Sequence, residues 1–221
     1  LCGAMTHMCI DATARAALGL ASVSAALLAA AAFFPPLDYD VVEYHLQLPR
    51  EWLANGKLCV LPHNAFSGFP AGQEMLTMLS LALGGTTTGV WTAQILNWCL
   101  LPLLLTATFF AARRWDQADH AGRDGAMLAS ALTLGCTLTP TLAMKLYVEL
   151  GLGVYFMLAA TAVAAAGSVQ LESRRWAVLA GLMAGAGCCA KYTGLIFLAA
   201  PLAALPWFWP TETPRSRRER L

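Results

Sequence analysis

Long apolar stretches separated by short polar ones dominate the chain. They cover residues 14–35, 89–112, 125–144, 148–168 and 176–209. A helix that crosses the hydrocarbon core of a membrane needs about 20 mostly apolar residues, so each of the first four stretches predicts one span. The fifth, as a single helix, would be about 51 Å long at about 1.5 Å per residue, against a core of about 30 Å. We therefore expect it to form two short helices broken near Lys191, which makes six hydrophobic helices in all.

The segment 36–88, between the first two apolar stretches, has a different pattern. Residues 41–54 carry apolar side chains near the spacing of one helix face, and residues 75–83 form an apolar run too short to span. Both are expected to be helices that lie at the membrane interface.

The positions of arginine and lysine predict an orientation, because positive charge is retained on the cytoplasmic side of a membrane. With the N-terminus inside, the cytoplasmic side receives Arg15, Arg113, Arg114, Arg123, Arg174, Arg175, Arg215, Arg217, Arg218 and Arg220. Only Arg50, Lys57, Lys145 and Lys191 then face outward. We expect a multi-pass protein of the cell inner (plasma) membrane with the segment 36–88 as its first external loop.

Composition agrees with a membrane protein. The chain of 221 residues is 58% hydrophobic and 12% charged, whereas soluble domains carry about 25% charged residues. The net charge of +1 gives no reason to expect a nucleic-acid partner. The seven cysteines form no ligand-spaced pair such as CxxC, and we interpret them as small packing residues. Because the chain starts at Leu1 and stops after a basic cluster, we expect 1–221 to be the N-terminal portion of one longer transmembrane domain.

Ionisable residues gather just after the first apolar stretch, at Asp38, Asp40, Glu43, Tyr44 and His45. Asp40, Glu43 and Tyr44 fall within one helical turn of each other. A carboxylate there could take a proton from a hydroxyl group or hold a divalent cation beside a phosphate. The alternative is that the aspartates only cap a helix.

Two further polar positions fall on the same expected face. Glu149 stands at the start of the fourth span, where it either serves a substrate, stabilises the helix N-terminus or pairs with Lys145 four residues earlier. Lys191, followed by Tyr192, interrupts an otherwise uncharged stretch. Its ammonium group either binds an anionic phosphate or extends to the membrane–water interface. Together they suit a substrate whose phosphate carries a lipid tail.

These residues resemble the GT-C superfamily of membrane glycosyltransferases, with the bacterial protein O-mannosyltransferase-like and lipid A aminoarabinose transferase-like branches the most similar. The likeness rests on Asp40 followed by Tyr44-His45-Leu46, then Pro49, Gly56-Lys57, Pro62, Asn64 and Ser67-Gly68-Phe69-Pro70. Tyr147-Val148-Glu149-Leu150 is similar to the family's second acidic position, and the turn around Lys191-Tyr192-Thr193-Gly194 to its short helical pair. The likeness covers most of 14–209, the N-terminal half of such an enzyme.

The resemblance implies an inverting transfer of a sugar from a polyprenyl-phosphate donor to an acceptor hydroxyl of a protein, lipid or glycan, outside the membrane. It implies that Asp40 is the base, that Glu149 is the second acidic residue and that Lys191 faces the donor phosphate. Asp38, Glu43, Tyr44, His45 and Tyr192 are expected to contribute to substrate binding. The chain departs from the family in having Val41 after Asp40, where a second acid is usual, and glutamate at 149, where aspartate is commoner.

The metal requirement stays open. A divalent cation is one option, whereas His45 and His63 without a third ligand make a poor zinc site. Two other classes compete with the enzyme. A transporter or flippase would place ionisable groups deep in its helices, and a non-catalytic membrane scaffold would need no site at all. The strongly polar residues of the second span are Gln94 and Asn97.

Overall fold

The computed structural model describes residues 33–115, 119–168 and 173–208, together with scattered positions between 12 and 31. Most of the expected first span, 14–35, and the basic cluster beyond residue 209 lie outside the described residues. Seven α-helices account for most of the described chain, with short stretches of π- and 3-10 helix between them. The predicted all-α class is confirmed for these residues.

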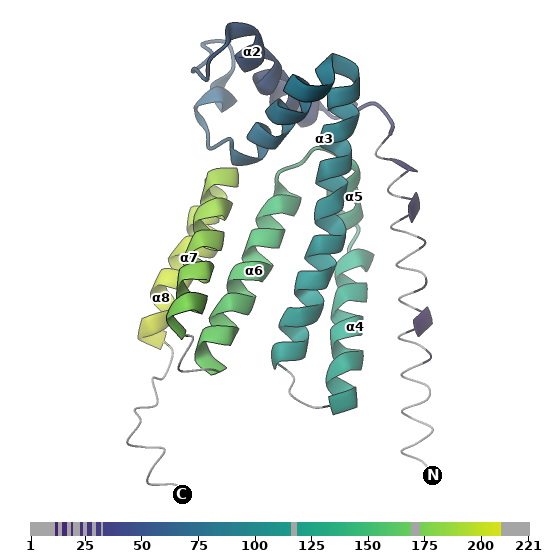
Figure 1. Ribbon diagram of the computed structural model, residues 1–221, viewed down its shortest axis with the longest axis vertical. Helices are drawn as coiled ribbons and strands as arrows, with labels where there is room; N and C mark the ends of the chain where they lie inside the picture. The colour runs from purple at the N-terminus through teal and green to yellow at the C-terminus, as the bar shows by residue number, and fades with distance from the viewer. Residues whose placement is uncertain are drawn as a thin grey trace, which may run out of the picture.

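The helices form a head and a bundle (Figure 1). The head consists of η1 (Val41–Leu46), α2 (Gln47–Asn55), η2 (Ala65–Gly68) and the first turns of α3 (Gly72–Trp115). The bundle consists of the rest of α3 with α4 (Asp119–Gly135), α5 (Leu138–Met144), α6 (Glu149–Ser168), α7 (Ser173–Ala190), η3 (Leu195–Ala199) and α8 (Ala200–Phe208). The head therefore sits on one end of the bundle.

A sharp kink at Gly85 joins the head to the bundle. The residue has φ 71° and ψ −168°, a conformation that is essentially restricted to glycine. Beyond the kink, the chain approaches so closely that a Cβ atom on Gly89 would lie 2.6 Å from the carbonyl oxygen of Ser80. The expected short helix 75–83 and the expected span 89–112 are thus the two arms of α3.

The described residues contain fewer membrane-crossing helices than the six we expected. Two helices, α3 and α6, are long and apolar enough to cross a membrane, and the pair α4–α5 makes a third if counted as one span bent by 64°. The expected span 125–144 breaks there because Pro140 cannot donate a backbone hydrogen bond inside a continuing helix. The two arms expected within 176–209 are α7, which begins at Ser173 with Arg174 and Arg175 in its first turn, and a shorter apolar helix over Leu195–Ala204.

The break expected near Lys191 is present. Helix α7 ends at Ala190, and the next helical segment begins at Leu195. A Cβ atom on Gly194 would lie 2.5 Å from the carbonyl oxygen of Gly187, so the turn requires glycine. The returning segment packs Leu198 against α6 and α7, so η3 lies beside α7.

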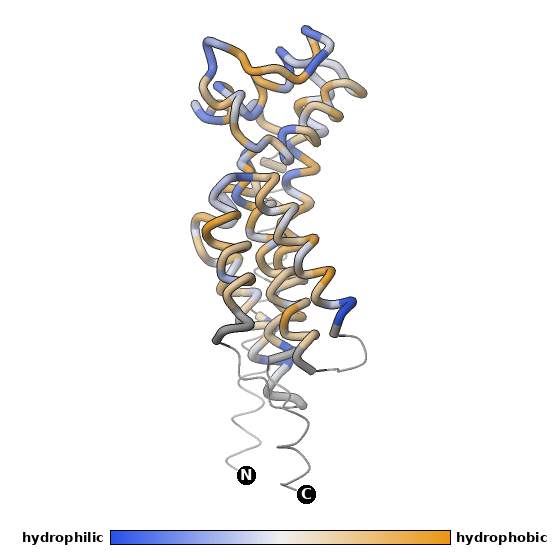
Figure 2. Tube along the Cα trace, turned by 90° about the vertical axis from the view of Figure 1, so that its left-hand side faces the viewer, coloured by the Kyte–Doolittle hydropathy of each residue, from blue (hydrophilic) through white to orange (hydrophobic). Residues whose placement is uncertain are grey.

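Apolar side chains fill the interior of the bundle and also cover its outside. Leu101, Leu104 and Leu134 pack with Leu150 and Val154 to join α3, α4 and α6. Large side chains such as Phe110, Leu132 and Leu182 are exposed. Figure 2 shows the bundle as largely hydrophobic, with hydrophilic stretches in the head and at the opposite end. A lipid environment suits such a surface, because soluble monomers rarely expose large apolar patches.

The strongly polar residues of α3 hold backbone segments together. Gln94 donates to the carbonyl oxygen of Phe34 at 2.9 Å. Asn97 donates to the carbonyl oxygens of Leu142, at 2.9 Å, and Lys145, at 2.5 Å. Both side chains are buried. These hydrogen bonds account for the presence of both polar side chains inside the bundle, so neither side chain requires a transport path to explain it.

Candidate functional site

The junction between the head and the bundle brings together three segments that are distant in the sequence. Val41 and Leu46 of η1 pack against Leu81 and Val90 of α3 and Leu146 of the turn before α6. These contacts fix the helical turn that carries Glu43, Tyr44 and His45 and that directly follows Asp38 and Asp40. The position of this turn is therefore set by the core.

Hydrogen bonds order the loop between α2 and α3 over the same turn. Asn64 Nδ2 donates to the carbonyl oxygen of Glu43 at 3.0 Å, and Asn64 Oδ1 accepts from the backbone N–H of Phe66 at 3.1 Å. Trp52 Nε1 donates to the carbonyl oxygen of Cys59 at 2.8 Å. The loop thereby places Phe66 beside η1.

Four aromatic rings follow one another along a cleft of about 140 Å³. Tyr44 stacks on Phe66, with ring centroids 4.2 Å apart and an interplanar angle of 17°. Phe66 meets Phe69 edge to face at 5.7 Å, and Phe69 meets Tyr192 in the same way at 5.6 Å. The cleft thus joins the head to the turn between α7 and η3, and Lys191 also lines it.

Two ion pairs connect the acidic and basic residues at this junction. Lys191 pairs with Glu149, so the first turn of α6 is tied to the end of α7. Lys145 Nζ lies 2.5 Å from Asp38 Oδ1, and this hydrogen bond raises the pKa of Lys145. The possible pairing of Lys145 with Glu149 is therefore wrong, since each of them has a partner far away in the sequence.

Negative charge gathers around two tyrosines. Burial, followed by the charges of Asp40 and Glu149, raises the pKa of Tyr44 to about 12. Burial, followed by the charges of Asp38 and Asp40, raises the pKa of Tyr147. The Asp40 carboxylate is half-buried and forms no ion pair or hydrogen bond with any described residue. Asp40 is thus a carboxylate available to a ligand, and the Tyr44 hydroxyl keeps its proton at neutral pH.

A buried pair beneath the cleft was missed by the sequence reasoning. His45 Nδ1 lies 2.7 Å from Glu74 Oε1, and the two residues are 2% and 5% exposed. Glu74 stands in the first turn of α3, where the sequence pattern gave it no role beyond starting a short helix. The partners are 29 residues apart, and no local spacing connects them.

The structure brings together some of the expected site residues and separates others. The cleft is lined by Tyr44, His45, Lys191 and Tyr192. Asp40 and Glu149 lie close enough to act on the Tyr44 phenol. Asp38 is engaged by Lys145 instead. Glu43 contributes its carbonyl oxygen to the bond with Asn64, and its side chain does not line the cleft.

The described residues contain no group of three or more His, Cys, Asp and Glu side chains placed to hold a metal ion. His63, considered as a ligand with His45, is exposed and lies 3.0 Å from Glu51 Oε2 instead. The two histidines therefore have different partners.

The cleft offers a protonated phenol, an ammonium group that the Glu149 carboxylate neutralises and a row of aromatic rings, and the free carboxylate of Asp40 lies beside it. Such groups can accept a proton, bind an anion and stack against a flat apolar face of a ligand. No known protein family, curated protein or solved structure matches the chain.

Proposed function

We propose that this chain belongs to a glycosyltransferase that moves a sugar from a polyprenyl-phosphate donor to an acceptor hydroxyl, with inversion. The observation that supports it most is the cleft lined by Tyr44 and Lys191 at one end of an apolar bundle, with the carboxylates of Asp40 and Glu149 beside these two residues. A donor with a lipid tail and a phosphate needs an apolar surface and polar groups at one boundary.

In the proposed reaction, the acceptor oxygen attacks the anomeric carbon of the sugar, and the bond from that carbon to the phosphate oxygen breaks. Asp40 takes the acceptor proton, because it is a carboxylate without a partner among the described residues. The electron pair leaves with the polyprenyl phosphate. Lys191 moves from Glu149 toward the departing phosphate and stabilises its charge.

We also propose that the head faces the external side of the plasma membrane and that the N-terminus is cytoplasmic. Support comes from Arg113, Arg123, Arg174 and Arg175, which belong to the ends of α3, α4 and α7 opposite the head. Positive charge is retained on the cytoplasmic side. The donor would then be bound at the external face.

The test is a transfer assay on membranes that contain the protein, with empty membranes as the control. Polyprenyl-phosphate donors carrying different labelled sugars are added together with the extracted protein, lipid and glycan fractions of the cell. Movement of one label into an acceptor fraction is the expected result. A label that crosses the bilayer but stays on its donor would instead identify a transporter or flippase, and a label that does neither would favour a scaffold.

A further inference from the structure

Glu74 is the most unusual polar residue near the cleft. Its carboxylate is buried, and only Oε1 has a partner, the His45 ring, while Oε2 is buried without one. A buried carboxylate oxygen left without a donor is unfavourable, so such atoms in native proteins are normally completed by a water molecule or a ligand.

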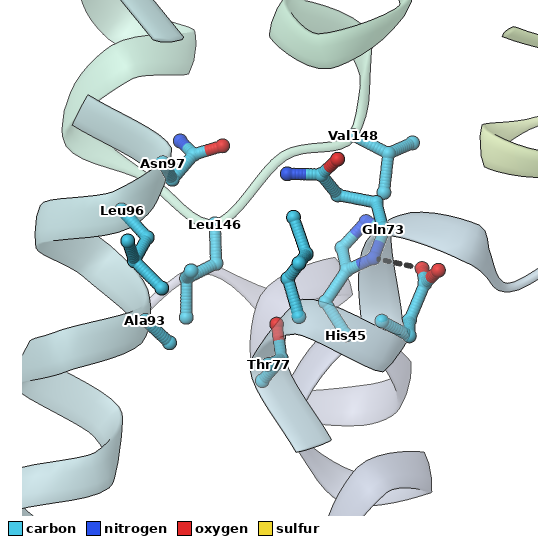
Figure 3. Close-up of a pocket in the computed structure, with 10 residues that line it drawn as sticks. His45, Gln73, Thr77, Ala93, Leu96, Asn97, Leu146 and Val148 are labelled. Carbon is cyan, nitrogen blue, oxygen red and sulfur yellow. Dashed lines mark hydrogen bonds and ion pairs between the residues drawn. The ribbon is translucent and has the colours of Figure 1, made fainter. Parts of the chain in front are cut away.

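The pair of His45 and Glu74 separates two spaces. On one side is the aromatic cleft. On the other is a small cavity of about 10 Å³, which has room for about one water molecule. Figure 3 shows Gln73 beside the His45 ring and Asn97 across this small cavity. The buried atoms His45 Nε2 and Asn97 Oδ1 lack a partner among the described residues. Glu74 lines both spaces, so its Oε2 atom is within reach of a water molecule in the small cavity or of a ligand in the cleft.

We propose that Glu74 is a specificity-determining residue of the cleft, where Oε2 accepts a hydrogen bond from one hydroxyl group of a bound sugar ring. His45 fixes the carboxylate by holding Oε1, and the rings of Phe66, Phe69 and Tyr192 receive the apolar face of the sugar. An ionised carboxylate only accepts hydrogen bonds, so it selects a ligand that donates. The inference rests on the proposed function and names a contact that recognises its sugar.

The first experiment measures binding alone, with no acceptor present. The protein is reconstituted in lipid nanodiscs, and glucose 1-phosphate, mannose 1-phosphate and galactose 1-phosphate are titrated by saturation-transfer NMR. With the tightest of these probes, Glu74→Gln is expected to weaken binding about tenfold or more, because a bond to a charged acceptor is lost. Glu51→Gln, which changes a half-buried glutamate of α2 outside the cleft, is expected to bind as the parent does.

The second experiment separates recognition from a structural role. The same titration uses the monodeoxy forms of the probe, each lacking one hydroxyl group. For the parent, one of these deoxy probes is expected to bind about tenfold more weakly than the complete probe. For Glu74→Gln, the same deoxy probe and the complete probe are expected to bind equally well. Glu74→Asp, which keeps the charge but shortens the side chain, is expected to lose the same preference and replaces Glu74→Gln if that variant does not fold.

Three results would overturn the inference: parent-like binding by Glu74→Gln, a deoxy effect of equal size in parent and variant, or no binding of any of the three sugar phosphates. Asp40→Asn is the reference for the proposed function, since it should bind the probe and fail only in transfer. Transfer that depends on Asp40, together with unchanged binding by Glu74→Gln, would reject the role of Glu74 and retain the proposed function.

Discussion

Replacing Asn97 by alanine is expected to destabilise the bundle by about 1–3 kcal/mol. The Asn97 amide is 2% exposed and donates two hydrogen bonds, to the carbonyl oxygens of Leu142 and Lys145. These carbonyls lie at the end of α5, where the last carbonyl groups of a helix have no partner in the helix itself. The substitution therefore removes the side-chain donor of both carbonyl oxygens, and among the described residues only that of Lys145 keeps a second donor, the backbone N–H of Tyr147.

The magnitude follows from the two bonds. Hydrogen bonds between helices of membrane proteins contribute about 0.6 kcal/mol on average and about 1.7 kcal/mol at most, and Asn97 makes two of them. Thr92→Ala is the matched control, because Thr92 is exposed and its hydroxyl bonds only to Thr88 of the same helix. Its expected effect is within about 0.5 kcal/mol of zero.

The assay is reversible unfolding of the purified protein in mixed micelles with increasing sodium dodecyl sulfate, followed by far-ultraviolet circular dichroism. Asn97→Leu is measured beside Asn97→Ala, since it approximately keeps the side-chain volume and removes the polar amide. A free energy of unfolding for both variants equal to that of Thr92→Ala would refute the assignment of Asn97 as the tie between α3 and α5.

Two further predictions test the kink and the electrostatics of the cleft. Gly85→Ala should lower the free energy of unfolding by about 1–3 kcal/mol, because Gly85 has a positive φ. The control is Gly181→Ala, at a helical site with open space around it, which should raise the free energy of unfolding by about 0.5–1 kcal/mol. Equal effects of the two substitutions in the same unfolding assay would contradict the kink. In Asp40→Asn the pKa of Tyr44 should fall from about 12 toward its ordinary 10 without reaching it, because burial is the larger cause and remains. Carbon-13 NMR titration of the tyrosine ring carbons, assigned with Tyr44→Phe, measures the pKa of Tyr44. The control Asp124→Asn in α4 should leave this pKa unchanged. An unchanged pKa in Asp40→Asn would show that the Asp40 charge does not act on Tyr44.

Local patterns were enough to predict the parts of this fold that depend on helix length and on polar residues at helix ends. The break near Lys191 followed from a stretch too long for one helix, and the start of α6 at Glu149 from the polar residue before an apolar run. Among the described residues, fewer spans are present than expected because apolar length alone does not show a bend. Pro140 and the arginines of α7 are the residues that divide or shorten the expected spans.

The site was predictable only in part, because its contacts join residues far apart in the sequence. Tyr44 and Lys191 were expected on one face, and they line one cleft. The partners of Lys191 and Asp38 lie 42 and 107 residues away, at Glu149 and Lys145, and no spacing rule connects such positions. Glu74 was missed for the same reason. Each of these pairs depends on the tertiary packing of α3, α6 and α7.

The proposed function depends on Asp40 acting as the base for sugar transfer. Single-turnover transfer in membranes tests it most directly, with Asp40→Asn compared with the parent and with Asp124→Asn, which changes a carboxylate on α4 outside the cleft. Loss of the base is expected to slow transfer by a factor of about 10²–10⁴ at an equal amount of protein in the membrane, with the control unchanged. Transfer by Asp40→Asn within threefold of the parent rate would contradict the account.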